Sequence, residues 1–244
     1  MKLEQYLKEI EKFEKDYLES SKMDGYVLGL SGGIDSALAA LLTVKAVGND
    51  KLFNVMMPIH SNPSDLNDAL KLAKEYNLNY IVIDLSDAFD KVYNSITDKH
   101  KLTGLAIHNI KVRLRMVTLF AIAQERRSLV IGTDNLDEHY VGYFTKYGDG
   151  AADILPLVRL LKREVYEASR IYGVIPEILN KKPSAGLFEN QTDEGEMGVT
   201  YNELDDYLIG KEINEKSKAI IDRLHRISEH KRVAIPRPIE YKRD

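Results

Sequence analysis

The sequence predicts an α/β protein with a doubly wound, mostly parallel sheet and helices on both of its faces. Short apolar runs alternate along the chain with longer segments whose apolar residues recur at helical spacing. The first apolar run ends in a glycine-containing turn that leads into a helix-like segment, as in sheets with crossover helices. This alternation favours parallel strands that are buried on both faces.

The individual elements follow from local patterns. Four apolar runs predict strands, at residues 26–30, 52–58, 80–85 and 128–132. Helical spacing and start signals predict helices at residues 3–18, 37–47, 64–76, 86–96, 105–127, 160–172, 201–209 and 213–228. Further predictions are an ordered loop at residues 141–156 and lid or binding loops at residues 61–68 and 181–200. No clear domain boundary interrupts these patterns, so we expect one domain over residues 1–244, with additional C-terminal helices.

The composition is that of an ordinary globular protein. Hydrophobic residues make up 44% and charged residues 30% of the chain, whose net charge is −4 and whose pI is near 5.9. This mildly acidic balance argues against nucleic-acid binding as the main function. No apolar run approaches the roughly 18 residues that cross a bilayer. The N-terminal pattern is that of an amphipathic helix rather than a signal peptide, so we expect a cytoplasmic protein.

The most informative motif is the turn after the first predicted strand, which reads Ser31, Gly32, Gly33, Ile34, Asp35 and Ser36. It places free backbone N–H groups, two hydroxyls and a carboxylate at the positive end of a predicted helix, which suits a phosphate anion. The sequence contains no G-x-x-x-x-G-K-[ST] motif, so this is not a Walker A loop. The alternative is a turn that only closes the sheet, but such a turn does not require Ser, Asp and Ser together.

The Ser-Gly-Gly-x-Asp-Ser string resembles the PP-motif of the N-type ATP pyrophosphatases, which cleave ATP between the α and β phosphates. Five further segments, in their order and spacing, are similar to the family of ammonia-dependent NAD synthetases. They lie at residues 109–116, 132–138, 142–150, 182–194 and 230–232, and the most distinctive one contains Phe-Thr-Lys-Tyr-Gly-Asp-Gly. The resemblance covers residues 3 to 232 and implies a Rossmann-like ATP pyrophosphatase fold.

The resemblance also implies a reaction. ATP adenylates the carboxylate of nicotinic acid adenine dinucleotide (deamido-NAD) and releases pyrophosphate, after which ammonia displaces AMP and NAD is formed. Family members that use glutamine carry a glutaminase domain with a catalytic cysteine. This sequence contains no cysteine, which also excludes disulfides, cysteine-ligated zinc and iron–sulfur clusters. We therefore expect no glutaminase domain, and either free ammonia or ammonia from a separate protein as the nitrogen source.

The resemblance assigns the ATP and metal contacts residue by residue. The expected ATP contacts are Gly29, Ser31, Gly32, Gly33, Ile34, Asp35, Ser36, Arg115, Thr133, Lys162 and Ser184. Asp35 and Glu138 match the ligands of Mg²⁺, which prefers one or two carboxylates together with phosphate oxygens. Lys162 and Ser184 also match catalytic positions, and Ser184 keeps the hydroxyl of the threonine that is common in the family. Taken alone, Glu138 and Arg115 would also fit exposed helix faces.

The same resemblance assigns the acid substrate to eight residues, which are Asn109, Tyr143, Phe144, Lys146, Asp153, Glu196, His230 and Lys231. Stacking of Tyr143 and Phe144 on the pyridine ring is one interpretation, and an ordinary hydrophobic core is the other. Amide formation needs neutral NH₃, so a carboxylate must take a proton from ammonium. Asp149 is the candidate base, although turn chemistry alone also favours Asp at that position. The resemblance further implies a homodimer.

Two other functions remain as alternatives. One is another ATP pyrophosphatase, such as a GMP synthetase synthase domain or a tRNA lysidine synthetase, although a tRNA enzyme should carry a basic docking surface. The other is a sensor that binds ATP without turnover, which would not need Asp35, Glu138 and Lys162 together. Release of pyrophosphate only when ATP and the dinucleotide are both present would separate these possibilities.

Overall fold

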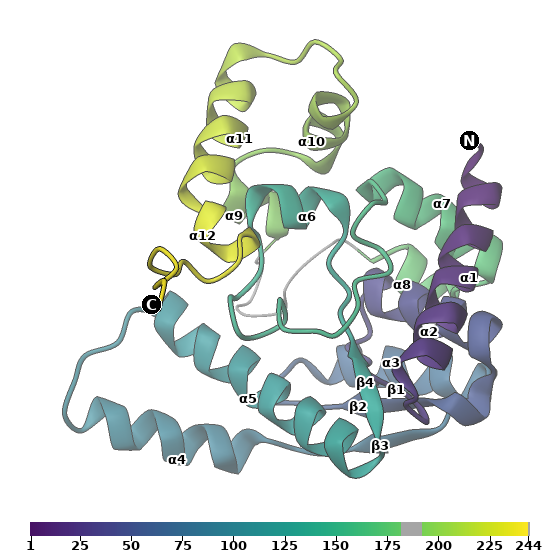
Figure 1. The fold of residues 1–244 in the computed structure, drawn as a ribbon. Coiled ribbons are helices and arrows are strands. Elements are labelled where there is room, and N and C mark those ends of the chain that lie inside the picture. Colours follow the sequence, from purple (N-terminus) through teal and green to yellow (C-terminus); the bar gives the residue numbers. More distant parts are fainter. Residues whose placement is uncertain (182–191, 244) are drawn as a thin grey trace.

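The computed structural model describes residues 1–181 and 192–243 and has the predicted α/β architecture (Figure 1). Its parallel sheet has the strand order β3-β2-β1-β4. The strands are β1 (Gly25–Gly29), β2 (Leu52–Met56), β3 (Tyr80–Val82) and β4 (Ser128–Ile131). All four predicted strands are therefore present, and the parallel arrangement is confirmed.

Helices connect the strands and continue after the last one. Those in the first half are α1 (Leu3–Ser21), α2 (Ile34–Val47), the 3₁₀ turn η1 (Asn49–Lys51), α3 (Pro63–Glu75), α4 (Ser86–Thr97) and α5 (Gly104–Glu125). Those after β4 are α6 (Leu136–Val141), α7 (Lys162–Tyr172), α8 (Pro176–Leu179), α9 (Asp193–Met197), α10 (Tyr201–Leu208), α11 (Glu215–Ile227) and α12 (Glu229–Arg232). The eight predicted helices are all present, with boundaries that differ by a few residues.

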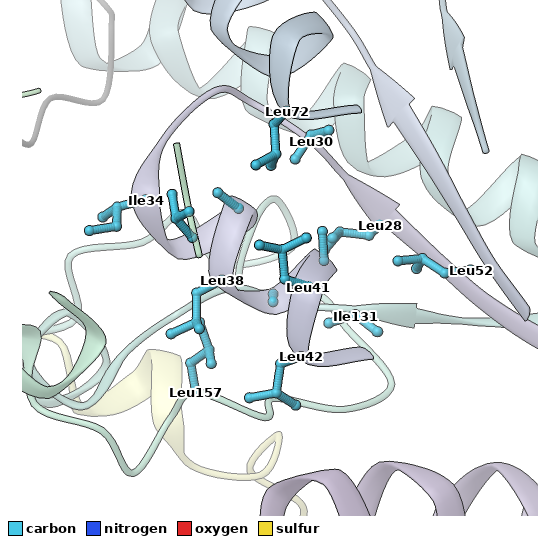
Figure 2. Close-up of a cluster of buried hydrophobic side chains, with 14 of the residues drawn as sticks. Leu28, Leu30, Ile34, Leu38, Leu41, Leu42, Leu52, Leu72, Ile131 and Leu157 are labelled. Carbon is cyan, nitrogen blue, oxygen red and sulfur yellow. The ribbon is translucent and has the colours of Figure 1, made fainter. Parts of the chain in front are cut away.

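The main core lies between one face of the sheet and α2. Leu28 of β1 and Leu38 and Leu42 of α2 are fully buried there, and α1 and α7 pack against α2 from outside (Figures 1 and 2). Because α2 is covered on several sides, it is apolar around most of its circumference rather than along one stripe. This packing fixes the turn at residues 31–36 at the carboxyl edge of the sheet.

A smaller core covers the opposite face. Val27, Val55 and Val130, from three neighbouring strands, pack there against Ala123 and Leu119 of α5. Figure 1 shows α4 and α5 on this side and α1, α2 and α7 on the other, so the sheet is covered on both faces as predicted. A third cluster joins α6 to α9, α10 and α11.

The short helices are the main difference from the sequence-based expectation. The helix α6 has only six residues, which is too few to show a period, and Asn135 caps it by accepting the N–H of Glu138 (3.0 Å). The helix α9 lies inside the segment expected to be a loop. The strand β3 ends at Val82 rather than at residue 85, at the edge of the sheet.

Glu14 of α1 is a buried acid far from the carboxyl edge of the sheet, and burial raises its pKa to about 8. An unfolded glutamate titrates near 4.5, so the folded state binds its proton more tightly and stability falls as pH rises from about 4.5 to about 8. Glu14→Gln should therefore raise the free energy of unfolding by about 2–4 kcal/mol above pH ~8. Urea unfolding at pH ~5 and ~9 measures this, and equal pH dependence in both proteins would contradict it.

Candidate active site

The turn after β1 folds into a compact loop, which is stabilised by hydrogen bonds of its two serines. The N–H of Gly33 donates to Ser31 Oγ (3.2 Å), and Ser36 Oγ donates to the carbonyl of Gly33 (3.0 Å). No side chain caps the start of α2, so the first N–H groups of this helix are free to bind an anion. The loop thus has the geometry that the sequence predicted for a phosphate site.

Gly32 allows this loop to pack closely on α3. Its φ is +83°, and a Cβ at this position would lie 2.2 Å from the backbone oxygen of Asp65. Both features exclude a side chain, because L-residues disfavour positive φ and the nearest atom belongs to the backbone. The start of α3 is therefore held directly against the loop.

Lys162 joins two acids from distant parts of the chain. Its Nζ lies 2.7 Å from Asp35 Oδ2 and 3.1 Å from Glu138 Oε1, and its side chain is 3% exposed. Burial alone would lower the pKa of Lys162, but the two carboxylates outweigh burial and raise it. Burial raises the pKa of Glu138 to about 7, against the opposing effect of Lys162. The structure thus places Lys162 in direct contact with both of the acids that the resemblance assigns to Mg²⁺.

The short helix α6 and the start of α7 position these side chains. Asn135 donates to Asp35 Oδ1 (2.9 Å), and Asp137 Oδ2 accepts the backbone N–H of Lys162 (2.8 Å). Tyr201 of α10 donates to Glu138 Oε1 (3.0 Å). In Figure 1, α6 lies between the sheet and the C-terminal helices, so it links both parts of the molecule to the lysine.

A cavity of about 960 Å³ lies at the carboxyl edge of the sheet, where ligands of such sheets bind. Ten residues predicted to contact ATP line it, namely Gly29, Ser31, Gly32, Gly33, Ile34, Asp35, Ser36, Arg115, Thr133 and Lys162. Glu138, Asp149 and Tyr143 line it as well. Ser184, which completes the predicted set, lies outside the described residues.

Arg115 is held in the wall of this cavity by the segment that follows β2. Its Nε donates to the carbonyl of Met57 (3.0 Å), and its side chain also donates to Ser61 Oγ (3.4 Å). Burial lowers its pKa. The interpretation of Arg115 as an exposed helix residue is therefore wrong, because its guanidinium reaches inward from α5.

The donor set fits a divalent cation that is bound together with phosphate. Asp35 and Glu138 converge on one ammonium group, so their oxygens lie near enough to share a cation. No group of three or more possible metal ligands is found among residues 1–181 and 192–243. Mg²⁺ typically takes one or two carboxylates and completes its shell with phosphate oxygens and water, so two carboxylates beside a phosphate site suffice.

Two further acids, Asp149 and Asp134, line the cavity, and the charge of Asp149 raises the pKa of Asp134. Asp149 is accessible within the cavity, and its Oδ1 accepts the N–H groups of Thr145 (2.7 Å) and Gly150 (3.2 Å). The surrounding protein removes water from the carboxylate of Asp149, and this desolvation raises its pKa. The hydrogen bonds from these N–H groups oppose the shift. The second acid, Asp134, was not singled out from the sequence, because Asp in a Gly-Thr-Asp-Asn segment is typical of an ordinary turn.

The residues predicted to contact the acid substrate are mostly held by other parts of the chain. Tyr143 lines the cavity and donates to Asp193 (3.2 Å). The ring of Phe144 is buried and stacks on His139, so it does not reach the cavity wall formed by the described residues. Asp153 accepts the backbone N–H of Val130 (2.7 Å).

The other predicted substrate contacts lie around the segment that follows α6. The side chain of Asn109 accepts from Thr145, Glu196 accepts from Tyr143, and Lys146 donates to the carbonyl of His230. Lys231 donates to the carbonyls of Gly142 (2.7 Å) and Phe144 (2.6 Å). None of Asn109, Lys146, Glu196, His230 and Lys231 lines the cavity in the part of the chain that is described.

His108 of α5 is a further cavity residue that sequence reasoning left without a role. Burial and the nearby Arg115 lower the pKa of His108 to about 4, so its imidazole is neutral at physiological pH. A single histidine on an apolar helix carries no spacing signal, and only the fold could place it here.

Comparison with known proteins identifies the family of this chain. A family model described as NAD synthase matches residues 6–243. The chain belongs to the NAD synthase family. A relative from Mesoplasma florum named NH(3)-dependent NAD(+) synthetase is 47% identical over 100% of both chains. Another with the same name, from Alkaliphilus metalliredigens, is 46% identical over 92% of this chain and 94% of its own.

Solved structures share the fold of this chain. The NMN synthetase from Francisella tularensis superposes with a TM-score of 0.94 at 41% identity, covering 98% of this chain and 100% of that chain. The NH3-dependent NAD synthetase from Campylobacter jejuni gives a TM-score of 0.81 at 29% identity, with 98% and 100% coverage. Among the described helices, none has the length and apolar character that crossing a membrane requires.

Proposed function

We propose that this protein amidates nicotinic acid adenine dinucleotide with ammonia at the expense of ATP, and so forms NAD, AMP and pyrophosphate. The observation that carries the proposal is the full-length match to relatives named NH(3)-dependent NAD(+) synthetase. The geometry supports it, because a phosphate-type loop and a lysine with two acids line one cavity. Ammonium-dependent formation of NAD by the purified protein tests it.

In the first step, the substrate carboxylate attacks the α-phosphorus of ATP and pyrophosphate leaves. The N–H groups of Gly32 and Gly33 and the hydroxyls of Ser31 and Ser36 would bind the departing pyrophosphate. Lys162 supplies a fixed positive charge where negative charge develops. Ser184 would contribute a hydroxyl donor to the same phosphates, and Arg115 and Thr133 would contact the nucleotide.

Asp35 and Glu138 would hold Mg²⁺ between the protein and the phosphates of ATP. The metal would neutralise phosphate charge in a cavity whose own acids otherwise repel an anion. These acids are Asp35, Asp65, Asp134, Glu138, Asp149 and Asp193, whereas Arg115, Lys162 and Lys181 are the basic residues of its described wall.

For the acid substrate, we propose that Tyr143 contacts the pyridine ring from the cavity wall. Asn109, Phe144, Lys146, Asp153, Glu196, His230 and Lys231 would act around this position, either by direct contact or by fixing the segment that carries Asp149. In the second step, Asp149 would take a proton from ammonium, and the resulting ammonia would displace AMP. The whole reaction would run in the single domain formed by residues 1–244 with free ammonia.

A second candidate substrate is nicotinic acid mononucleotide. The 41% identity and TM-score of 0.94 to a structure described as an NMN synthetase favour it. In addition, most residues assigned to the dinucleotide do not line the described cavity. The ratio of kcat/KM for the acid dinucleotide and the acid mononucleotide, each measured with saturating ATP and ammonium, decides between them.

The exposed side of α5 supports a homodimer. Only Ala123 of this 22-residue, largely apolar helix is buried, and Val117 is 59% exposed. Val117→Lys should therefore convert a dimer into monomers, because a buried unpaired charge is costly. Analytical ultracentrifugation measures the mass, and Ile171→Lys on α7, also at a half-exposed apolar residue, is the control. A dimer that survives Val117→Lys would place the interface elsewhere.

A further inference from the structure

Asp134 is a buried acid in the cavity wall to which the proposed reaction gives no role so far. The residue is 5% exposed, and its Oδ2 has no hydrogen-bond partner among the described residues. It nevertheless lines the cavity that contains the loop at residues 31–36 and Lys162. A buried carboxyl oxygen without a donor is costly, so a ligand in the cavity that donates hydrogen bonds to the Asp134 carboxyl group would stabilise it.

Asp149 lines the same cavity, and its charge acts on Asp134. Burial, followed by the charge of Asp149, raises the pKa of Asp134, and Glu138 and Asp35 act in the same direction. Lys231 opposes these effects at both acids, and Arg115 also faces Asp149. Burial and the like charges around it therefore favour the protonated form of Asp134 when no ligand is bound.

The nearby lysine does not satisfy these acids directly. Lys231 donates to the carbonyls of Gly142 and Phe144, and it forms no ion pair with an acid in the part of the chain that is described. The wall around Asp134 and Asp149 thus has more acid groups than contacting cations. A small cation with several N–H donors would supply both the missing charge and the missing hydrogen bonds.

The chemistry of amide formation calls for two proton acceptors. Ammonium must lose one proton before its nitrogen has a lone pair. When this nitrogen forms the C–N bond, the carbon–oxygen bond to AMP breaks, and its electron pair leaves with the AMP oxygen. The new amide nitrogen then loses a second proton. One carboxylate accepts one proton, so Asp149 alone cannot take both.

We propose that Asp134 and Asp149 together bind ammonium, and that each carboxylate takes one of the two protons. This inference rests on the proposed amidation. Binding of the cation displaces the proton of Asp134, because its positive charge stabilises both carboxylates. Ammonium then gives its first proton to one carboxylate and the amide nitrogen gives the second to the other, while AMP leaves.

Comparison of two nucleophiles tests this arrangement. Hydroxylamine is a neutral amine near neutral pH and needs only one acceptor, whereas ammonium needs two. Asp134→Asn should lower the ammonium-dependent rate about 100-fold and the hydroxylamine-dependent rate less than about 5-fold. Asp149→Asn should behave in the same way, and the double variant should lose both reactions. The ratio of the two rates does not depend on how much of a sample is folded.

Pyrophosphate release keeps this inference separate from the proposed function. In Asp134→Asn the first turnover of pyrophosphate release should stay close to wild type, because adenylation precedes the ammonia step, whereas later turnovers should slow together with amide formation. The control is Asp84→Asn, since Asp84 follows β3 and accepts the N–H of Ser86 (2.8 Å) without lining the cavity. Equal slowing of both nucleophiles by Asp134→Asn, or no change in either, would overturn the role of Asp134. Failure of the wild-type protein to release pyrophosphate would instead overturn the proposed function.

Discussion

Replacement of Lys162 by methionine should lower the rate of pyrophosphate release about 1,000-fold. The substitution removes a positive charge that lies within hydrogen-bond distance of both Asp35 (2.7 Å) and Glu138 (3.1 Å). Asp35 and Glu138 would then repel each other and the incoming phosphates. The effect is large because the site is buried: the side chain of Lys162 is only 3% exposed in the wild-type protein. A pyrophosphate-coupled assay with saturating ATP and acid substrate measures the loss.

Lys71→Met is the matched control for this prediction. Lys71 pairs with Glu177 at the surface, where its side chain is 57% exposed, so the same change removes a charge without touching the cavity. It should leave the rate unchanged. A Lys162→Met protein that keeps more than about a tenth of the wild-type rate would show that the lysine does not stabilise the developing charge.

Gly32→Ala should abolish ATP binding and lower the melting temperature. The added Cβ would lie 2.2 Å from the backbone oxygen of Asp65, and the positive φ of +83° adds strain. Neither atom can move without separating α3 from the loop at residues 31–36, so we expect a loss of about 3 kcal/mol in stability. Thermal unfolding and ATP titration by calorimetry measure the two effects.

Gly210→Ala separates the two causes. Gly210 has a similar φ of +78°, but no atom lies within 4 Å of the position of its Cβ. This variant should therefore show only the smaller cost of the backbone conformation, about 1 kcal/mol, and normal ATP binding. If both glycine variants lost the same stability, close packing between the loop and α3 would not be the reason for Gly32.

The sequence predicts the layers of this fold well because each layer has a strong local signal. Strands buried on both faces appear as continuous apolar runs, and helices such as α5 are long enough to show their period. The short helix α6 has no such signal, since six residues make less than two turns. Its position depends on Asn135 and Asp137, whose partners lie far away in the chain.

The part of the candidate site that one short, continuous segment forms could be predicted from the sequence. The loop at residues 31–36 is local, and the sequence places it before the fold is known. The meeting of Lys162 with Asp35 joins residues 127 positions apart, which only the resemblance to a family indicated beforehand. Asp134 lay beyond both kinds of reasoning, because its importance comes from burial and an unpaired oxygen, which are properties of the folded chain.

Isotope labelling of the substrate carboxylate tests the proposed adenylation most directly. The acid dinucleotide, labelled with a heavy oxygen isotope in its carboxylate, is mixed with the protein, ATP, Mg²⁺ and ammonium, and the products are analysed by mass spectrometry. Attack of the carboxylate on the α-phosphorus predicts one heavy oxygen in AMP and none in pyrophosphate. Heavy oxygen in inorganic phosphate, together with ADP, would show cleavage at the γ-phosphorus and contradict the account.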